Sequence, residues 1–386
     1  GLDDGRRLLH HFGAVDWAAK VLINGKLVGE HKGGYDSFSL DVTDAVKAGA
    51  ENEIIVGVFD ETGGFQPKGK QHLPAIEKPG GIMYTPCSGI WQTVWLETVP
   101  GNYIESVRIV PDVDNGQVRI LVRAKSKTES GVIDAVVRDG GSVVVQKRGN
   151  AGTEVKIKIR NPKLWSADSP FLYDVTVTLK TGGGLFRAGK TVDEVSSYFG
   201  MRKVSLGKDE KGFMRMLLND KFVFQSGPLD QGFWPDGIYT APTDEALKFD
   251  IEATKKLGMN MARKHVKVEP ARWYYWCDKL GLLVWQDMPG GGIGHGANKE
   301  KEGTAVSPEG EAQFEAEFKA MIETHISHPS IIMWIVFNEG WGQHDTVRLT
   351  KWVKELDPSR LVSNASGWND RYCGDIVDMH NYPGPG

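Results

Sequence analysis

Seven consecutive apolar residues at 331–337 (IIMWIVF) constrain the fold of this chain more than any other segment. A strand that faces water on one side alternates apolar and polar residues, whereas a strand in a parallel sheet is covered on both faces and stays apolar throughout. The run is therefore expected to be a central parallel strand. Because parallel strands are joined by crossover connections, helices should flank it along the chain.

The C-terminal half of the chain has this alternation of strand and helix. Thr243 is a suitable N-cap for the first helix, and Gly258 is a suitable end. Leu247, Ile251 and Leu257 recur on one face of that helix. Such a β/α series favours an eight-stranded barrel over a doubly wound sheet, and six strands leave the barrel incomplete. The six predicted strands are 222–224, 260–263, 282–286, 331–337, 361–363 and 376–379.

The N-terminal half is typical of an all-β structure. Asn24 and Gly25 separate two apolar runs, which is a strong hairpin signal because both turn positions need positive φ. Short strands and Gly-rich turns predict a jelly-roll-like β-sandwich over residues 1–100 and an immunoglobulin-like β-sandwich over residues 101–200. Residues 201–386 would then form the TIM barrel, with its first six strands only.

Composition excludes several kinds of partner. The 386 residues carry a net charge of -4 and no block of Lys or Arg, which argues against nucleic acid. No apolar run is long enough to span a bilayer, so no membrane partner is expected. Three widely separated cysteines indicate neither a disulfide framework nor a metal site. The sequence leaves the compartment open, periplasmic or secreted included, and it leaves a homo-oligomer open.

Polar residues follow most of the predicted barrel strands. In a barrel these positions meet at one rim, where active sites lie, so we expect them to form a substrate site. Residues 290–296 (GGGIGHG) are expected to be a rim loop rather than a phosphate-binding loop, because the βαβ context is missing. The rim candidates in chain order are Asp230, Trp234, Arg263, His265, Asp287, Asn338, Glu339, Trp341, His380 and Tyr382.

Glu339 is the most specific of these candidates. A carboxyl group that ends a strongly apolar strand enters a partly desolvated site, the environment of a general acid. Glycoside hydrolysis needs such an acid and a second carboxylate about 5 Å away as nucleophile. Asn338 is suited to bond a sugar hydroxyl, and Trp341 to stack on a pyranose. The alternative is that Asn338 and Glu339 cap the next helix, and for Asp230 and Trp234 packing is as strong an expectation as substrate contact.

Several motifs together resemble glycoside hydrolase family 2, which includes β-galactosidases, β-glucuronidases and β-mannosidases. Residues 336–340 (VFNEG), after residues 328–334 (HPSIIMW), resemble its acid/base signature. The order of the motifs covers nearly the whole chain. Residues 263–265 and 274–285 resemble the family's second and third barrel strands, 12–17 and 89–97 its sugar-binding sandwich, and 164–173 the end of its immunoglobulin-like domain.

The resemblance implies a retaining exo-glycosidase that acts on terminal β-linked sugars, with galactosides slightly favoured. Glu339 would be the acid/base, Asn338 would contact the 2-hydroxyl, Arg263 would support the nucleophile, and Tyr382 would lie near it. The partner would be a glycoside or an oligo- or polysaccharide. No cofactor is implied, and no metal, because residues 287–292 (DMPGGG) stand where some β-galactosidases carry magnesium ligands.

By the same resemblance, the nucleophilic Glu belongs to the end of a seventh strand, and the first sandwich begins partway through. We therefore expect a fragment truncated at both ends, which alone is inactive. Two alternatives stay open at this point: a catalytically inactive carbohydrate-binding or structural fragment, and one part of a complementing pair.

Overall fold

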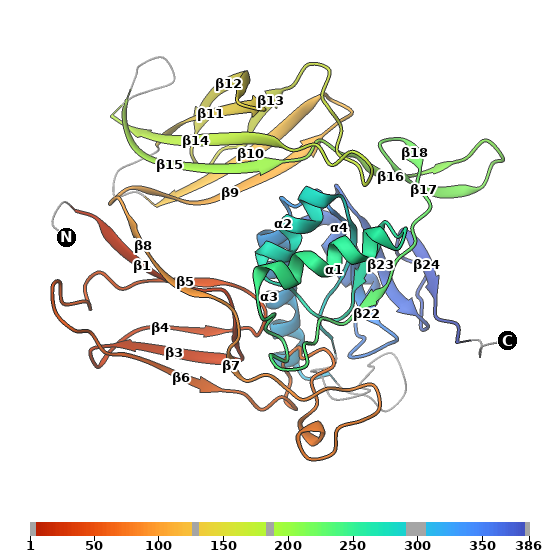
Figure 1. Cartoon of the computed structure of the whole chain (residues 1–386), viewed down its shortest axis with the longest axis horizontal. Coiled ribbons are helices and arrows are strands. Elements are labelled where there is room, and N and C mark those ends of the chain that lie inside the picture. Colours follow the sequence, from red (N-terminus) through yellow and green to blue (C-terminus); the bar gives the residue numbers. More distant parts are fainter. Residues whose placement is uncertain (1–4, 126–130, 183–188, 291–305, 383–386) are drawn as a thin grey trace.

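The computed structural model describes residues 5–125, 131–182, 189–290 and 306–382. Two β-sandwiches lie beside a curved parallel sheet that is covered by helices, and this multidomain architecture confirms the predicted fold class (Figure 1). Of the predicted rim loop at 290–296, only Gly290 is among the described residues. No described helix has the length and apolar character needed to cross a membrane.

The first sandwich is built from three small sheets. Asn24 and Gly25 have φ of 52° and 79°, so the predicted hairpin turn is present. Its core contains Phe12, Val15 and Val21, all fully buried. The strands are β1 (Arg7–Phe12), β2 (Val15–Asp16), β3 (Ala18–Ile23), β4 (Lys26–Lys32), β5 (Phe38–Asp41), β6 (Ile54–Phe59), β7 (Gly89–Ile90) and β8 (Val94–Val99), with a 3-10 turn at Leu73–Ile76.

The second sandwich packs a three-stranded sheet against a four-stranded one, in the orders β13-β10-β9 and β12-β11-β14-β15. Alternate residues such as Val118, Ile120 and Val122 point into its core, as the sequence pattern predicts. Its strands are β9 (Tyr103–Asp112), β10 (Gln117–Lys125), β11 (Val132–Asp139), β12 (Ser142–Asn150), β13 (Val155–Lys158), β14 (Tyr173–Thr181) and β15 (Lys190–Phe199).

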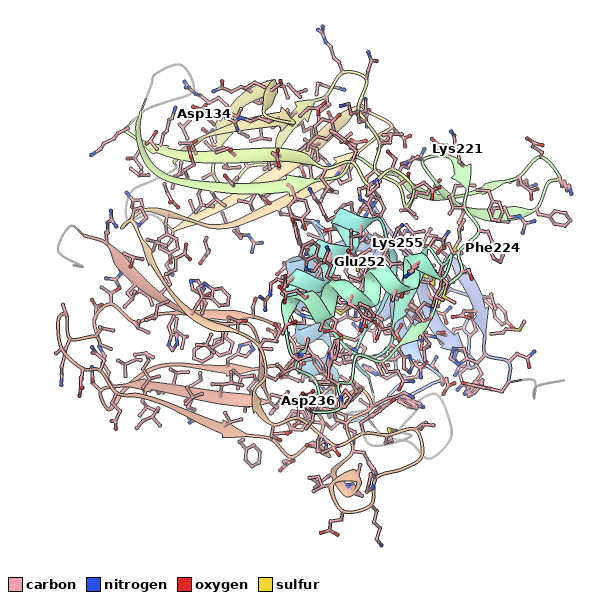
Figure 2. The ribbon with its side chains drawn as sticks, in the orientation of Figure 1. Asp134, Lys221, Phe224, Asp236, Glu252 and Lys255 are labelled. Atoms are coloured by element: carbon pink, nitrogen blue, oxygen red, sulfur yellow. The ribbon has the colours of Figure 1, made fainter. Side chains whose placement is uncertain are left out.

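The apolar run at 222–224 is not the first barrel strand, so this prediction is wrong. A separate antiparallel sheet contains β16 (Val204–Lys208), β17 (Met214–Leu218) and β18 (Lys221–Phe222). Figure 2 shows Lys221 and Phe224 beside this projecting hairpin, and Phe224 is 74% exposed. Three apolar residues in a row suit an exposed hairpin edge as well as a buried strand, so the pattern alone could not separate the two.

The barrel sheet contains six parallel strands in sequence order. Its first strand is the short β19 (Leu229–Asp230), followed by β20 (Met261–Lys264), β21 (Leu283–Asp287), β22 (Ile331–Asn338), β23 (Leu361–Gly367) and β24 (Ile376–Met379). Every residue of β22 is buried, as its apolar run predicts. Within the described residues β19 and β24 are not paired with each other, so the sheet is an open half-barrel.

In the described part of the chain, four helices connect these strands: α1 (Asp244–Lys256), α2 (Ala271–Leu280), α3 (Pro308–His325) and α4 (Thr346–Leu356). The Thr243 side chain accepts a hydrogen bond from the Ala246 amide, which confirms the predicted N-cap. Leu247 and Ile251 are buried, but Leu257 is 75% exposed. Leu257 is the C-cap residue, outside the last helical turn, so its side chain leaves the apolar face.

The first sandwich and the barrel share one core. Tyr35 and Trp91 from the sandwich pack on Tyr239 of the barrel, and the Tyr35 and Tyr239 hydroxyls are 3.1 Å apart. Glu317 on α3 accepts hydrogen bonds from the Trp17 indole (3.2 Å) and from the amide of Gly34 (3.3 Å). Burial at this interface raises the pKa of Glu317 to about 8.

Glu317 makes the stability of the protein depend on pH. Because the folded state holds its proton more tightly than the unfolded chain, the contribution is largest below about pH 4.5 and is lost as the pH rises through 8. As the pH rises through this window, we expect the free energy of unfolding of the wild type to fall relative to that of Glu317→Gln. The expected fall is up to about 1.4 kcal/mol per pH unit. Thermal denaturation from pH 5 to 9 measures it, with Glu323→Gln on the exposed face of α3 as the control. Parallel melting curves for wild type and Glu317→Gln would contradict this assignment.

Candidate active site

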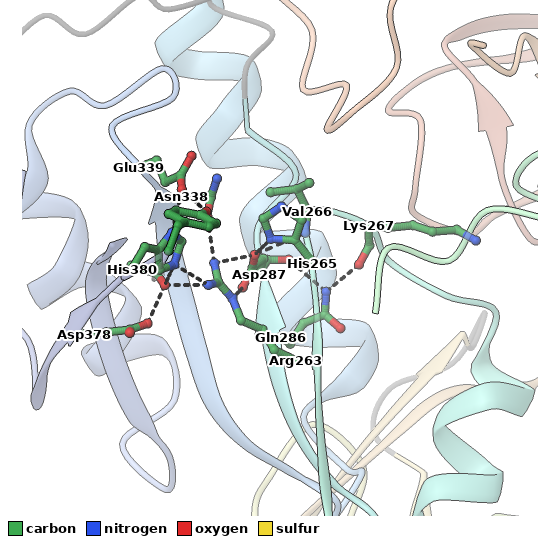
Figure 3. A network of polar contacts seen from close by, with 12 residues as sticks. Arg263, His265, Val266, Lys267, Gln286, Asp287, Asn338, Glu339, Asp378 and His380 are labelled. Atoms are coloured by element: carbon green, nitrogen blue, oxygen red, sulfur yellow. Dashed lines mark hydrogen bonds and ion pairs between the residues drawn. The ribbon is translucent and has the colours of Figure 1, made fainter. Parts of the chain in front are cut away.

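The guanidinium of Arg263, at the end of β20, is the centre of the rim (Figure 3). It is 7% exposed, and it pairs with both oxygens of Asp287 at 2.9 and 2.8 Å. It also donates to the Asn338 side-chain oxygen at 3.0 Å, and to Ser366 and His380 at 2.5 and 3.0 Å. Residues in or directly after the last two positions of five neighbouring strands are thereby joined at one rim.

Asp287 is the internal counter-ion of this arginine. Burial alone would raise the pKa of Asp287, but the attraction of Arg263 and hydrogen bonding from His265 outweigh it and hold the pKa below its usual value. The carboxylate therefore accepts from His265 Nδ1 at 3.0 Å and from the Val266 amide at 3.2 Å. Burial lowers the pKa of His265, so its ring is neutral and its Nε2 is an acceptor.

His380 links Arg263 to Glu339 by one hydrogen bond to each. Arginine has only donors, so His380 Nε2 must accept from it, and the ring proton lies on Nδ1. This Nδ1–H donates to Glu339 Oε1 at 2.5 Å, and the Tyr382 hydroxyl donates to the same oxygen at 3.1 Å. Glu339 is thus held as an acceptor by two neutral donors, with one oxygen fixed and the other free of these bonds.

The backbone at Glu339 turns sharply at the end of β22. Its φ is 52°, and its amide donates to Ser366 of the neighbouring strand at 2.9 Å. The helix cap alternative is not what the structure shows, because α4 starts at Thr346 after the N-cap Asp345. A residue other than glycine with φ in the left-handed region is uncommon. At Glu339 this conformation directs the carboxyl group toward the rim.

Two of the predicted rim residues lie outside this network. Asp230 pairs with Lys264 at 2.6 Å, and Lys264 also pairs with Glu269 at 2.8 Å. Trp234 is partly buried and packs against the main core. Both residues therefore contact other parts of the protein, and substrate contact by either stays a prediction.

Sequence reasoning missed Ser366 and Asp378, which hydrogen bond to each other beside Arg263. Ser366 is fully buried near the end of β23, so its position after the fifth apolar run was the available signal. Asp378 lies within β24 rather than after it, and no end-of-strand rule would select it. Among the described residues, no three His, Cys, Asp or Glu side chains are grouped to hold a metal ion.

Comparison with known proteins agrees with the family that the sequence motifs resemble. Residues 237–382 match the model described as glycosyl hydrolases family 2, TIM barrel domain, and residues 102–202 match the model described as glycosyl hydrolases family 2. The chain belongs to glycoside hydrolase family 2. Both matches lie in the order that the sequence motifs predict.

Named relatives of this family 2 chain include a beta-galactosidase and a beta-glucuronidase. A beta-galactosidase of Thermoanaerobacter pseudethanolicus is 29% identical over 92% of this chain and 46% of its own length. A beta-glucuronidase of Bacteroides fragilis is 26% identical over 98% of this chain and 55% of its own length. The chain therefore spans about half the length of the relatives it matches.

Solved structures show the same fold. An FMN-binding beta-glucuronidase from Facaelibacterium prausnitzii L2-6 superposes with a TM-score of 0.79 at 21% identity, covering 98% of this chain and 57% of that chain. A beta-glucuronidase from Parabacteroides merdae has a TM-score of 0.73 at 22% identity, with 97% and 47% covered. The three-part architecture is thus shared with these enzymes.

The Arg263–Asp287 pair can be tested by a double-mutant cycle. We expect Asp287→Asn or Arg263→Met alone to lower the free energy of unfolding by about 3–5 kcal/mol, because each leaves a buried charge unpaired. The double variant should cost less than the sum of the two single changes. Urea denaturation measures all four proteins, and additive losses would show that the two side chains do not depend on each other.

Proposed function

We propose that this family 2 chain provides the acid/base half of a retaining exo-glycosidase that hydrolyses terminal β-linked sugars. The observation that carries the proposal is the setting of Glu339. It follows the most apolar strand of the sheet, is 14% exposed at its side chain, and has one oxygen fixed by two donors. A carboxyl group used as acid and then as base needs this fixed position.

The proposed mechanism uses the free oxygen of Glu339. In the first step the second carboxylate, the nucleophile of a retaining enzyme, attacks the anomeric carbon as the bond from this carbon to the glycosidic oxygen breaks. The protonated carboxyl of Glu339 gives its proton from Oε2 to that oxygen, so the alcohol leaves and a covalent glycosyl-enzyme is formed. Oε1 keeps its bonds from His380 and Tyr382, and these stabilise the carboxylate that forms. In the second step this carboxylate takes a proton from water, whose oxygen attacks the anomeric carbon and displaces the enzyme nucleophile.

The neighbouring side chains suit a sugar substrate. The oxygen of Asn338 is used by Arg263, which leaves the amide nitrogen as the group to donate to a hydroxyl, the 2-hydroxyl by family resemblance. His265 Nε2 offers an acceptor beside it. Trp341, two residues after Glu339, offers an indole face for stacking on the ring.

The nucleophile completes the proposal. A retaining enzyme needs a second carboxylate about 5 Å from the acid/base. Among the described residues no Asp or Glu is bonded to Glu339. We propose that the nucleophile is a Glu at the end of a seventh strand next to β24, and that Arg263 supports it from below the rim.

Replacement of Glu339 tests the acid/base role. In the natural gene product that carries this chain, Glu339→Gln should lower the turnover of alkyl β-glycosides by about 100- to 10,000-fold. Nitrophenyl glycosides should lose much less in the glycosylation step, because their leaving groups need little protonation. Glu323→Gln, an exposed glutamate on α3, is the matched control. Equal losses for both leaving-group classes would rule out the acid role.

The place of the nucleophile has its own test. A 2-deoxy-2-fluoro β-glycoside with a good leaving group should accumulate a covalent glycosyl-enzyme, because the fluorine slows its hydrolysis. Peptide mass spectrometry then identifies the labelled residue. Label on a Glu after the strand that follows β24 supports the proposal, whereas label on Asp287 or Asp378 would overturn it.

A further inference from the structure

The connection between β6 and β7 of the first sandwich reaches the barrel rim. Gly69 donates from its amide to the carbonyl of Gly290 at 2.9 Å, three residues after Asp287. A Cβ at Gly69 would lie 2.1 Å from the carbonyl oxygen of Val266, and its φ is +59°. Only a glycine allows this close approach, so the connection is fixed against the rim beside His265.

Lys70 follows this anchor and brings a positive charge to the site. It is only 7% exposed, and its ammonium lies 5.9 Å from the centroid of the Trp341 ring. Burial lowers the pKa of Lys70, whereas the negative charge of Glu339 acts to raise it. The positive charge of Lys70 in turn acts to lower the pKa of His265. The ammonium therefore lies among the residues that surround the proposed sugar site.

In the part of the chain that the structure describes, Lys70 has no hydrogen-bonded or ion-paired carboxylate. Among the described residues no hydrogen bond or ion pair to its ammonium is present, and its contact is the indole face of Trp341. An aromatic face attracts a cation but offers no lone pair to its three donors. A buried ammonium is costly unless it is paired, so an anion that enters the site beside Lys70 would stabilise it.

We propose that Lys70 is a specificity-determining residue that binds an acidic group, a carboxylate or a sulfate, on the sugar held next to Glu339. This inference rests on the proposed glycosidase function and adds a substrate class to it. A sugar hydroxyl can accept a hydrogen bond from Lys70, but only an anion also neutralises its charge. The first sandwich would then select the substrate while the barrel performs the chemistry.

The test compares anionic and neutral substrates in the natural gene product. The probes are 4-nitrophenyl β-galactoside, β-glucuronide and 6-sulfo-β-galactoside, and the measured quantity is kcat/KM for each anionic probe divided by that for the neutral one. We expect Lys70→Met to lower this ratio by about 10- to 100-fold for the anion that the site binds, mainly through KM, the size of one charge-assisted hydrogen bond. Lys70→Arg should recover part of the loss. Loss for the glucuronide alone identifies a carboxylate, and loss for the sulfated sugar alone identifies a sulfate.

Lys68 provides a matched control two residues earlier. It is 5% exposed and likewise buried, but its electrostatic neighbour is Asp60 rather than Glu339. Lys68→Met should leave the anionic-to-neutral ratio within about threefold, even if it loosens the connection. An unchanged ratio in Lys70→Met, or an equal change in Lys68→Met, would overturn the inference.

Failure of the proposed function gives a different result. If the wild type hydrolyses none of the three probes, the glycosidase proposal fails, and calorimetric binding of D-glucuronate and galactose 6-sulfate replaces kinetics as the readout. Weaker binding of either anion to Lys70→Met than to Lys68→Met would still support the anion site. Equal binding to both variants, or no binding to the wild type, would overturn it.

Discussion

The buried guanidinium of Arg263 is the interaction on which the rim of this half-barrel depends. Its partners come from β21, β22 and β23 and from the residue that follows β24, while Arg263 itself is the penultimate residue of β20. A planar group with five donors in fixed directions can satisfy all of them only if the strands keep one register. A shift of any strand would leave a buried charge or a buried polar group unpaired. The arginine therefore couples the stability of the sheet to the position of Glu339.

The candidate site depends on more than the barrel. The contact of Gly69 with Val266 fixes a connection of the first sandwich at the rim, and Tyr35 and Trp91 extend the barrel core into the sandwich. Glu317 adds a buried carboxyl at the same interface. Because one core is shared, a change at the sandwich interface can reach the rim through packed side chains rather than through a flexible link. The two parts are joined by one continuous core.

Much of this arrangement could be predicted from local sequence, and the failures have physical reasons. The apolar run of β22, the Asn24–Gly25 turn and the Thr243 cap depend on neighbouring residues only, and all three are present. The first barrel strand was misplaced because β19 has two residues and carries almost no periodic signal. Leu257 was misplaced because a helix end is decided by the last turn rather than by the apolar period.

Long-range contacts set the limit for the site. End-of-strand positions selected Asp287, Asn338 and His380 around Arg263, since parallel strands all end at one rim, but not Ser366 and Asp378. Nothing in the local sequence of residues 60–88 indicates that Lys70 lies beside Trp341, because the two residues belong to different domains. The tautomer of His380 also follows only from its arginine partner. Contacts among residues at the ends of neighbouring barrel strands were largely predictable from the sequence. Contacts between the first sandwich and the barrel required the structure.

The balance of charge explains why these few residues can define a reactive site. Arg263 is matched by Asp287, and Lys264 and Lys267 are matched by Asp230 and Glu269. Glu339, in contrast, is bonded to a neutral imidazole and a neutral phenol. A carboxyl group beside neutral donors can bind and release a proton with little electrostatic rearrangement, whereas one paired with Arg263 would stay ionised. Because His380 lies between Arg263 and Glu339, the rim uses the charge of the arginine to orient the carboxyl group through the imidazole rather than by a direct ion pair.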